Sequence, residues 1–207
     1  CPGLSDTYGK DFEKLYKKYE KEILHLEKIK ARTLMSKIIE AQIETGQPYM
    51  LYKDSINNKS NQQNIGVIKS SNLCAEIVEY SDNNETSVCN LASIALPQFI
   101  KKTNNKKEYD YKKLYETAKL ATKNLDQVID INFYPTDKTK TSNNKHRPIG
   151  LGIQGLADVY FKLNIAYDSK KAVAINKRIF ETIYFGALEA SCELAKEKGA
   201  YSTFKGS

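Results

Sequence analysis

Long apolar runs are missing from this sequence of 207 residues. No stretch approaches the ~18 apolar residues of a membrane-spanning helix, so a membrane protein is not expected. The opening Cys1-Pro-Gly-Leu4 does not read as a signal peptide and carries no initiator methionine. We therefore expect an excised, internal piece of a longer protein. A content of 41% hydrophobic and 28% charged residues is ordinary for a globular domain with a real core.

Cysteine is also scarce, with four residues at positions 1, 74, 89 and 192. None of them forms a C-x-x-C pair, so a metal site is not expected. A chain of this length with good helical patterning needs no disulfide staples, which favours a reducing compartment. Cys192 lies among Ala190, Leu194 and Ala195 in an expected helix and is interpreted as a small buried thiol.

Histidine is rarer still, with two residues. His146 stands in the run Lys145-His-Arg-Pro148, where a structural hydrogen bond is favoured over catalysis. His25 lies in a charged stretch and is expected to be solvated. The 14 tyrosines are taken as packing residues.

The net charge of +7 and a pI near 9.0 raise nucleic-acid binding as one interpretation. Much of the excess lies in segments such as 101–107, which is expected to be a solvated, low-complexity loop. No aromatic residue is interleaved there for base stacking, so nucleic acid is not expected as a partner. Anionic nucleotide substrates would benefit from the positive field.

Apolar periodicity predicts four longer helices, over 11–22, 28–45, 111–131 and from Asp168 or Ser169 to Gly199, and a shorter one over 154–163. Strand composition appears at 49–52 and 147–153, and Gly150 and Gly152 are expected to let another segment approach closely. Residues 57–64 are expected to form a loop, and 89–100 fit either a strand or a helix. This alternation favours a single α/β unit, with barrel and open sheet both left open.

The segment Ser71-Asn-Leu-Cys-Ala-Glu-Ile77 places an amide, a thiol and a carboxylate at every second position. In an extended strand Asn72, Cys74 and Glu76 would share one face and lie within about 13 Å of each other. One nucleotide-sized ligand could then touch all three, although half-buried strands with one polar face are common. Cys89, 15 residues further on among small and apolar residues, strengthens the interpretation as thiol chemistry.

Several longer runs extend this pattern along the whole chain. The chain resembles the large catalytic subunit of aerobic (class I) ribonucleoside-diphosphate reductases of the eukaryotic type, from residue 1 to 207. The resemblance rests on TGQPYMLYKD (45–54), KSNQQN (59–64), SNLCAEIVEY (71–80), VCNLAS (88–93), NKHRPIGLGIQGLAD (144–158) and FETIYFGALEASC (180–192).

The resemblance implies a role for each candidate residue. Cys74 would be the transient thiyl radical that takes the 3′-hydrogen of the ribose, and Glu76 the general base for the 3′-hydroxyl. Asn72 would hold the reacting hydroxyls, and Leu73 would contribute substrate contacts and help to keep the radical dry. Cys89 would be one of two cysteines that become a disulfide, with its partner upstream of Cys1.

The resemblance also implies the fold and the partners. The fold would be part of a ten-stranded α/β barrel, with a central finger loop that carries the radical cysteine. The ATP-sensing domain, the allosteric specificity site, the phosphate loop and the C-terminal radical and electron relay would lie outside the 207 residues. The chain itself would bind no cofactor, because a diiron small subunit supplies the radical and ATP or deoxynucleotide effectors bind elsewhere. Further partners would be a ribonucleoside diphosphate, a second large subunit and thioredoxin or glutaredoxin, in the cytoplasm.

Two alternatives stay open. The chain could be a non-catalytic module that serves nucleotide or subunit binding, although such a module would need neither Cys74 nor Cys89. A vitamin B12-dependent or glycyl-radical reductase would share the finger-loop chemistry, but the long eukaryotic-type runs disfavour it.

Overall fold

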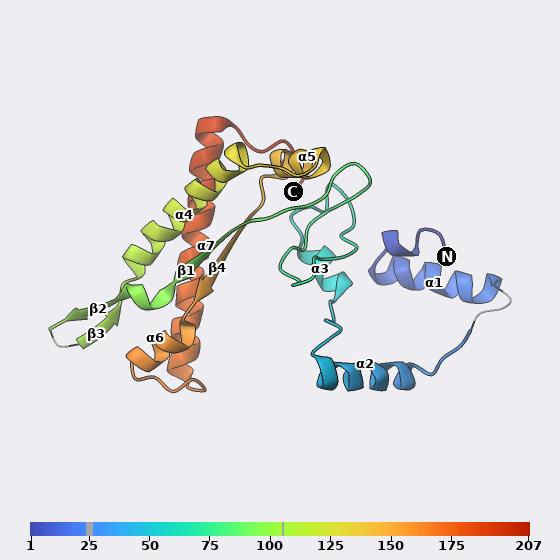
Figure 1. The fold of residues 1–207 in the computed structure, drawn as a ribbon, viewed down its shortest axis with the longest axis horizontal. Coiled ribbons are helices and arrows are strands. Elements are labelled where there is room, and N and C mark those ends of the chain that lie inside the picture. Colours follow the sequence, from blue (N-terminus) through green and yellow to red (C-terminus); the bar gives the residue numbers. More distant parts are fainter. Residues whose placement is uncertain (24–26, 105) are drawn as a thin grey trace. The chain divides into compact units, whose positions relative to one another are not determined.

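The computed structural model describes residues 1–23, 27–104 and 106–207 (Figure 1). By its internal contacts the chain divides into two compact units, where the sequence indicated one. Unit 1 comprises Cys1–Ser87 and Lys205–Ser207, and unit 2 comprises Val88–Phe204. Each unit has its own organisation and is described by itself.

Unit 1 consists of short helices and long connecting segments. Its elements are the 3₁₀ turn η1 (Leu4–Asp6) and the helices α1 (Gly9–Glu22), α2 (Ala31–Thr45) and α3 (Lys53–Lys59). The two predicted helices in this part are confirmed, and Gly46 ends α2 in a left-handed conformation (φ +76°). The prediction for 57–64 is wrong at its start, because α3 runs to Lys59. Residues 49–52, predicted from composition as a strand, have no regular secondary structure.

Polar side chains that bond to backbone groups hold unit 1 together. Asn57 is buried, donates to Ile68 O at 3.0 Å and accepts from Ile68 N at 2.8 Å. Asp54 accepts a hydrogen bond from Gly9 N at 2.9 Å, which ties α3 to the start of α1. Gln62 accepts from Tyr80 N at 2.7 Å. Apolar burial contributes little by comparison, since no residue of α1 or α2 is buried.

Over its described residues, unit 2 contains two parallel strands, a small hairpin, one 3₁₀ turn and four α-helices. The elements are β1 (Asn90–Ala95), η2 (Leu96–Phe99), β2 (Ile100–Thr103), β3 (Lys106–Tyr109), α4 (Tyr111–Ile131), α5 (Asp137–His146), β4 (Ile149–Gln154), α6 (Leu156–Lys162) and α7 (Lys170–Lys198). β1 pairs with β4 in parallel, with Asn90 opposite Ile149 and Ala95 opposite Gln154. The strand predicted at 147–153 is thereby confirmed, and 89–100 resolves into β1 followed by η2.

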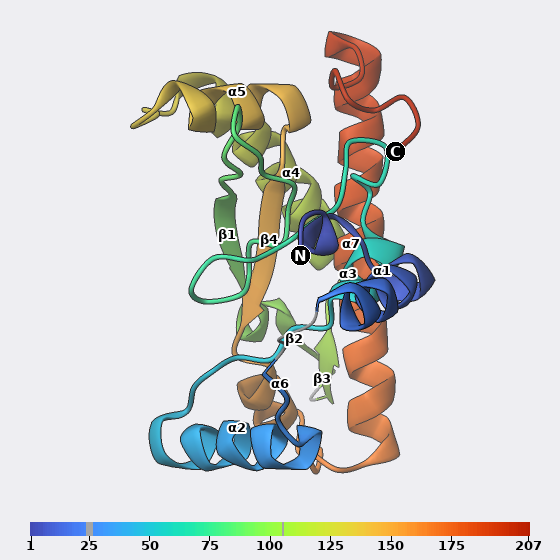
Figure 2. The ribbon, with the colours of Figure 1, turned by 90° about the vertical axis from the view of Figure 1, so that its right-hand side faces the viewer.

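The core of unit 2 lies where α4 packs against α7 on one side and against β1 and β4 on the other (Figures 1 and 2). The helix predicted at 111–131 is confirmed, and Asp110 caps it by accepting from Lys113 N at 3.1 Å. Gly186 lets α7 approach α4 closely, since a Cβ there would stand 3.0 Å from Tyr115 O. Full burial of each large apolar side chain contributes about 1.5–3 kcal/mol; the core includes Ile94, Leu96, Phe99, Leu114, Val159, Ile179 and Ile183.

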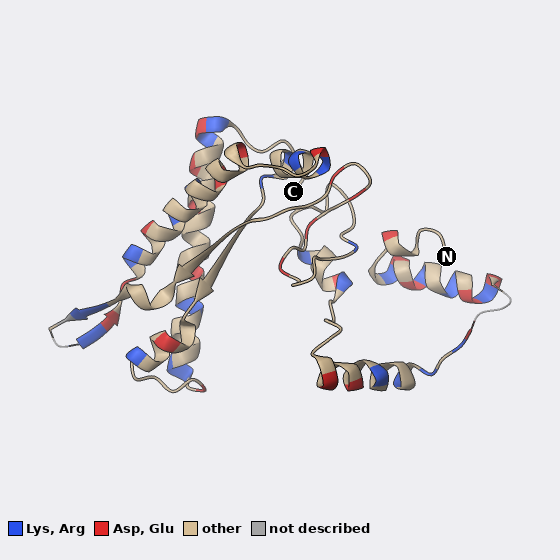
Figure 3. Cartoon of the chain, viewed as in Figure 1, with Lys and Arg blue, Asp and Glu red and all other residues tan. Residues whose placement is uncertain are grey.

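Two elements of unit 2 differ from the sequence prediction. The lysine-rich segment 101–107, predicted as a solvated loop, largely forms the antiparallel pair β2–β3 (Figure 3). The buried rings of Phe99, just before β2, and Tyr109, at the end of β3, pack against each other. This packing outweighs the low strand propensity of the lysines between them. α5 was not predicted, because its buried face is polar rather than apolar. The sequence did carry signals for the two ends of this helix: Thr136 caps its start, and the basic residues Lys145 and His146 stand in its last turn.

Cys192 is also placed differently from the prediction. It is exposed on α7 rather than buried. Ala190 is the fully buried residue at this point of the helix, and a step of two residues turns the side chain about 200° round the axis. Its small apolar neighbours in the sequence therefore do not surround it in the fold.

Candidate active site

Asn72, Cys74 and Glu76 lie on a tight turn and not on an extended strand. Ala75 N donates to Asn72 O at 3.2 Å, which closes a four-residue turn with Leu73 and Cys74 at its centre. Ala75 has φ +66°, a left-handed conformation that is costly for a residue with a Cβ. The prediction of a shared strand face was therefore wrong, because it assumed regular alternation through this segment.

A second set of hydrogen bonds makes this turn the tip of a closed loop, residues 72–77. Asn72 N donates to Ile77 O at 3.3 Å, and Ile77 N donates to Asn72 Oδ1 at 3.0 Å. Leu73, Cys74 and Glu76 project from that loop, and all three are exposed. The three predicted residues therefore belong to one short closed loop and not to an extended strand.

The tip offers three chemically distinct groups. The amide oxygen of Asn72 is engaged within the loop, whereas its Nδ2 group donates no hydrogen bond within the described residues. Cys74 is a free, exposed thiol. Glu76 is exposed and has no ion pair among the described residues. An amide, a thiol and a carboxylate thus lie within one six-residue loop. Leu73, at the centre of the turn, is 79% exposed.

Glu79 is a further titratable group near this loop that sequence reasoning missed. It is half-buried, and burial raises the pKa of its carboxyl from 4.5 to about 7. A carboxyl that titrates near neutrality can exchange protons at working pH. Nothing in the sequence pattern marks it, because the shift arises from burial in the fold.

Cys89 stands immediately before β1 in unit 2, whereas Cys74 belongs to unit 1. The Cys89 thiol is half-buried and lies 3.9 Å from Asn90 O. It faces β4 at Gly150, where a Cβ would stand 2.9 Å from the sulfur. Close approach at Gly150 was predicted and is confirmed. At Gly152 the nearest atom to such a Cβ is Ala92 O at 3.8 Å, an ordinary contact.

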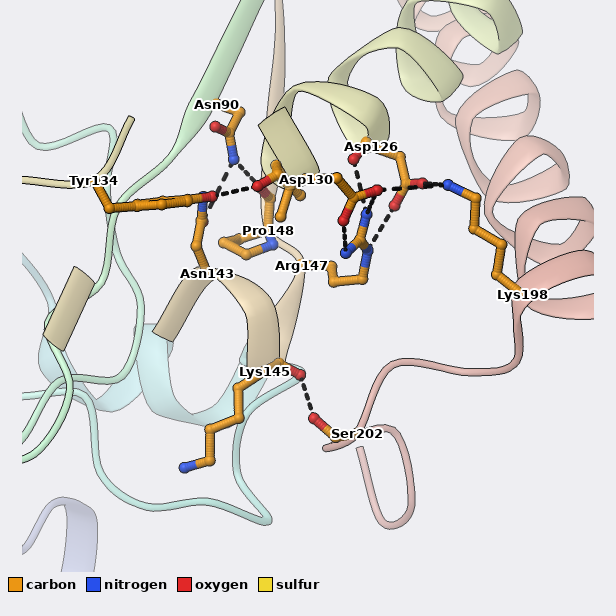
Figure 4. A network of polar contacts seen from close by, with 11 residues as sticks. Asn90, Asp126, Asp130, Tyr134, Asn143, Lys145, Arg147, Pro148, Lys198 and Ser202 are labelled. Atoms are coloured by element: carbon orange, nitrogen blue, oxygen red, sulfur yellow. Dashed lines mark hydrogen bonds and ion pairs between the residues drawn. The ribbon is translucent and has the colours of Figure 1, made fainter. Parts of the chain in front are cut away.

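A buried chain of amide and hydroxyl groups fixes the residue next to Cys89 (Figure 4). Asn90 Nδ2 donates to Pro148 O at 3.2 Å and lies 3.4 Å from Asn143 Oδ1. Asn143, fully buried in α5, donates to the hydroxyl of Tyr134 at 2.7 Å. That hydroxyl donates to Ile129 O at 2.7 Å. Buried polar groups held in this way specify one arrangement, so the start of β1 is fixed against α5 and β4.

Arg147 forms an ion cluster between α4, α5 and α7 (Figure 4). Its Nε donates to Asp126 Oδ1 at 2.7 Å and its Nη1 to Asp130 Oδ1 at 2.8 Å. Lys198 adds a bond to Asp126 Oδ2 at 2.8 Å. Burial alone would raise the pKa of Asp126, but the bonds from Arg147 and Lys198 outweigh it and lower that pKa. The hydrogen bond from Arg147 also lowers the pKa of Asp130.

Arg147→Ala is expected to loosen this part of unit 2. The substitution leaves Asp126, whose side chain is 12% exposed, with Lys198 as its remaining cation, and we expect a cost of about 2–3 kcal/mol. Hydrogen exchange of the β4 and α5 amides in the complete subunit measures it. Lys138→Ala, which removes an exposed cation from α5, is the matched control. Equal protection in the two variants would show that the cluster contributes nothing.

His146 has the structural role that the sequence favoured. It is buried at the end of α5, and its Nδ1 lies 2.9 Å from Thr203 Oγ1. His25 lies outside the described residues. Over the described ranges, no group of three His, Cys, Asp or Glu side chains is arranged to hold a metal ion. None of the helices described is long and apolar enough to cross a membrane.

Comparisons with known proteins find the same family over the entire chain. Residues 1–207 match the family model described as "Ribonucleotide reductase, barrel domain". The large subunit of ribonucleoside-diphosphate reductase from Plasmodium falciparum is 56% identical over 207 residues, which is 100% of this chain and 25% of that protein. Large chain 2 from Saccharomyces cerevisiae is 56% identical over 209 residues and is covered to 24%.

A solved structure resembles the fold as well. The alpha subunit of the class Id ribonucleotide reductase of Actinobacillus ureae superposes with a TM-score of 0.75 at 31% identity. The match covers 96% of this chain and 36% of that one. The fold is thus a mixed α/β piece of a reductase barrel domain. The chain belongs to the ribonucleotide reductase large-subunit family, and it spans about a quarter of the length of the curated relatives named here.

Proposed function

We propose that the chain is part of a catalytic subunit that reduces ribonucleoside diphosphates to deoxyribonucleoside diphosphates for DNA synthesis. The observation that carries the proposal is the closed loop 72–77, which presents Asn72, Cys74 and Glu76 together. Membership of the reductase family gives this combination a matching chemistry. Loss of a ribose 2′-hydroxyl requires a radical at C3′, a base for the 3′-hydroxyl and a dithiol reductant.

The proposed reaction begins at Cys74. Its thiyl radical takes the hydrogen atom from C3′, which leaves a Cys74 thiol and a carbon radical. Glu76 accepts the proton of the 3′-hydroxyl, and the amide of Asn72 donates to the reacting hydroxyls. The left-handed Ala75 between Cys74 and Glu76 sets the direction of both side chains.

The proposed reduction is completed by a pair of cysteines that includes Cys89. The 2′-oxygen takes a proton from this pair and leaves as water. The pair supplies two electrons and two protons in total and forms one S–S bond: one proton leaves in the water, and the other proton and one electron reduce C2′. The second electron reduces the C3′ carbonyl, and Glu76 returns its proton to the 3′-oxygen. The Cys74 thiol returns its hydrogen atom to C3′, so that the thiyl radical is regenerated. Thioredoxin or glutaredoxin then reduces the disulfide.

The proposal includes the partners and the setting of the complete subunit. A diiron small subunit supplies the radical, and two large subunits associate. The proposal assigns four further parts to the remainder of the complete subunit. They are the second cysteine of the reducing pair, the substrate phosphate loop, the effector sites for ATP and deoxynucleotides, and the C-terminal relay. The reaction takes place in the cytoplasm, where reduced thiols persist.

Glu76→Gln tests the proposed base in the complete subunit. The amide keeps the shape of the side chain but cannot accept the 3′-hydroxyl proton, so we expect kcat to fall about 10²–10⁴-fold. KM should change little, because binding contacts are retained. The measurement is the rate of deoxynucleotide formation with small subunit and reductant supplied.

Glu79→Gln is the matched comparison, since it changes another carboxyl of the same segment. It should keep most of the activity. A large loss in Glu79→Gln together with an active Glu76→Gln would transfer the role of base to Glu79. Absence of deoxynucleotide formation by the unmodified complete subunit would refute the proposed function as a whole.

A further inference from the structure

Gly150 of β4 leaves the space in which the Cys89 sulfur lies. A Cβ on Gly150 would stand 2.9 Å from Cys89 Sγ and would also overlap Leu91 Cδ2. Non-bonded heavy atoms of this kind pack at about 3.5–4.0 Å. A single added methyl group therefore cannot be accommodated unless both of these side chains move.

The pairing of the two strands produces this contact. Leu91 lies opposite Gly150 in the parallel register, and Cys89 precedes Leu91 by two residues. Side chains two apart lie on the same side of an extended segment, so the thiol and Leu91 both cover Gly150. Asn90 points the other way, to Pro148 O and Asn143.

The two neighbours of Gly150 differ in their freedom to move. Leu91 is 58% exposed, and the end of its side chain can rotate into open space. Cys89 is half-buried, its sulfur turns about one bond only, and the bonds of Asn90 fix the backbone beside it. An added methyl group would therefore displace the sulfur, even where Leu91 moves aside at little cost.

We propose that Gly150 is a positioning residue for Cys89, which keeps the thiol at the place from which it reduces the substrate. The inference rests on the proposed function for the role of Cys89 as a redox thiol. In that role Cys89 and its partner cysteine lose two electrons and two protons and form one S–S bond. Both sulfurs must meet the substrate and each other, so a displaced sulfur slows this step.

The experiment is a single turnover of the pre-reduced complete subunit without external reductant. A misplacement of about 1 Å can cost as much as 10²-fold, so Gly150→Ala should slow product formation about 10–100-fold at saturating substrate. Nucleotide affinity should be unchanged, because Gly150 adds no side chain to a binding contact. Gly152→Ala, the same change two residues along β4 with only an ordinary contact, should stay within about twofold of the unmodified protein.

A double variant separates the two contacts and keeps the test usable where Gly150→Ala alone perturbs folding. Leu91→Ala with Gly150→Ala removes the overlap at Leu91 and leaves the one at Cys89, so the slow turnover should persist. Recovery of the normal rate in the double variant would overturn the inference. Equal rates of product formation in Gly150→Ala and Gly152→Ala, with Cys89→Ser inactive, would also overturn the inference. Normal turnover in Cys89→Ser would instead overturn the proposed role of Cys89 itself.

Discussion

Cys74→Ser in the complete subunit is expected to reduce deoxynucleotide formation below detection while nucleotide binding is retained. Serine keeps the size of the side chain at the tip of loop 72–77, so the turn and its hydrogen bonds should persist. Its O–H bond is too strong for the radical to form there, and the 3′-hydrogen of the ribose is then never taken. The test measures two quantities on the same preparation. One is the rate of product formation, which should be lost, and the other is the equilibrium binding of a ribonucleoside diphosphate, which should be retained.

Cys192→Ser provides the control for this prediction. Cys192 is an exposed thiol on α7, with no role in the proposed chemistry, and its replacement should leave turnover unchanged. Normal activity in Cys74→Ser would refute the proposed thiyl-radical mechanism. Loss of nucleotide binding together with activity would show instead that Cys74 acts mainly in binding.

The long helices α4 and α7 of unit 2 could be predicted because their apolar residues recur at helical spacing. α4 buries Leu114, Ala118 and Ile129 at helical spacing, and Asp110 caps it. α5 escaped prediction because its buried face consists of Thr139, Ser142, Asn143 and His146. Partners on other segments, such as Asn90 and Thr203, satisfy several of these polar groups. A local pattern cannot reveal partners so distant in the chain.

The candidate site shows the same division between residue identity and geometry. The chemical types at 72, 74 and 76 could be read from the sequence. Their arrangement could not be predicted, because the alternating pattern indicates a strand, whereas Ala75 adopts a left-handed conformation that ends the alternation. The Gly150–Cys89 contact depends on segments far apart in the chain. The raised pKa of Glu79 depends on its burial in the fold. Side-chain chemistry at this site is thus local information, whereas its geometry is set by the rest of the fold.

The strand edges in unit 2 give the second large expected effect, which concerns the 207-residue chain produced alone. Within the described residues β1 and β4 pair only with each other, so each has one open edge. Large apolar side chains on several helices are also exposed; among them are Ile43 (81%), Phe161 (87%), Tyr184 (66%) and Phe185 (61%). Open edges and exposed apolar surface favour association between copies. We therefore expect self-association of the isolated chain, measured by light scattering.

The same isolated chain should form no deoxynucleotide, even with small subunit and a thioredoxin-type reductant supplied. In the proposed mechanism Cys89 needs a second cysteine and Cys74 needs a radical relay, and the proposal assigns both to other parts of the complete subunit. Ile43→Lys places a charge on the exposed stripe of α2 and should lower the scattering without creating activity. An inactive, monodisperse monomer would contradict the association alone. Turnover by the isolated chain would show that the reducing cysteines or the radical route have been assigned wrongly.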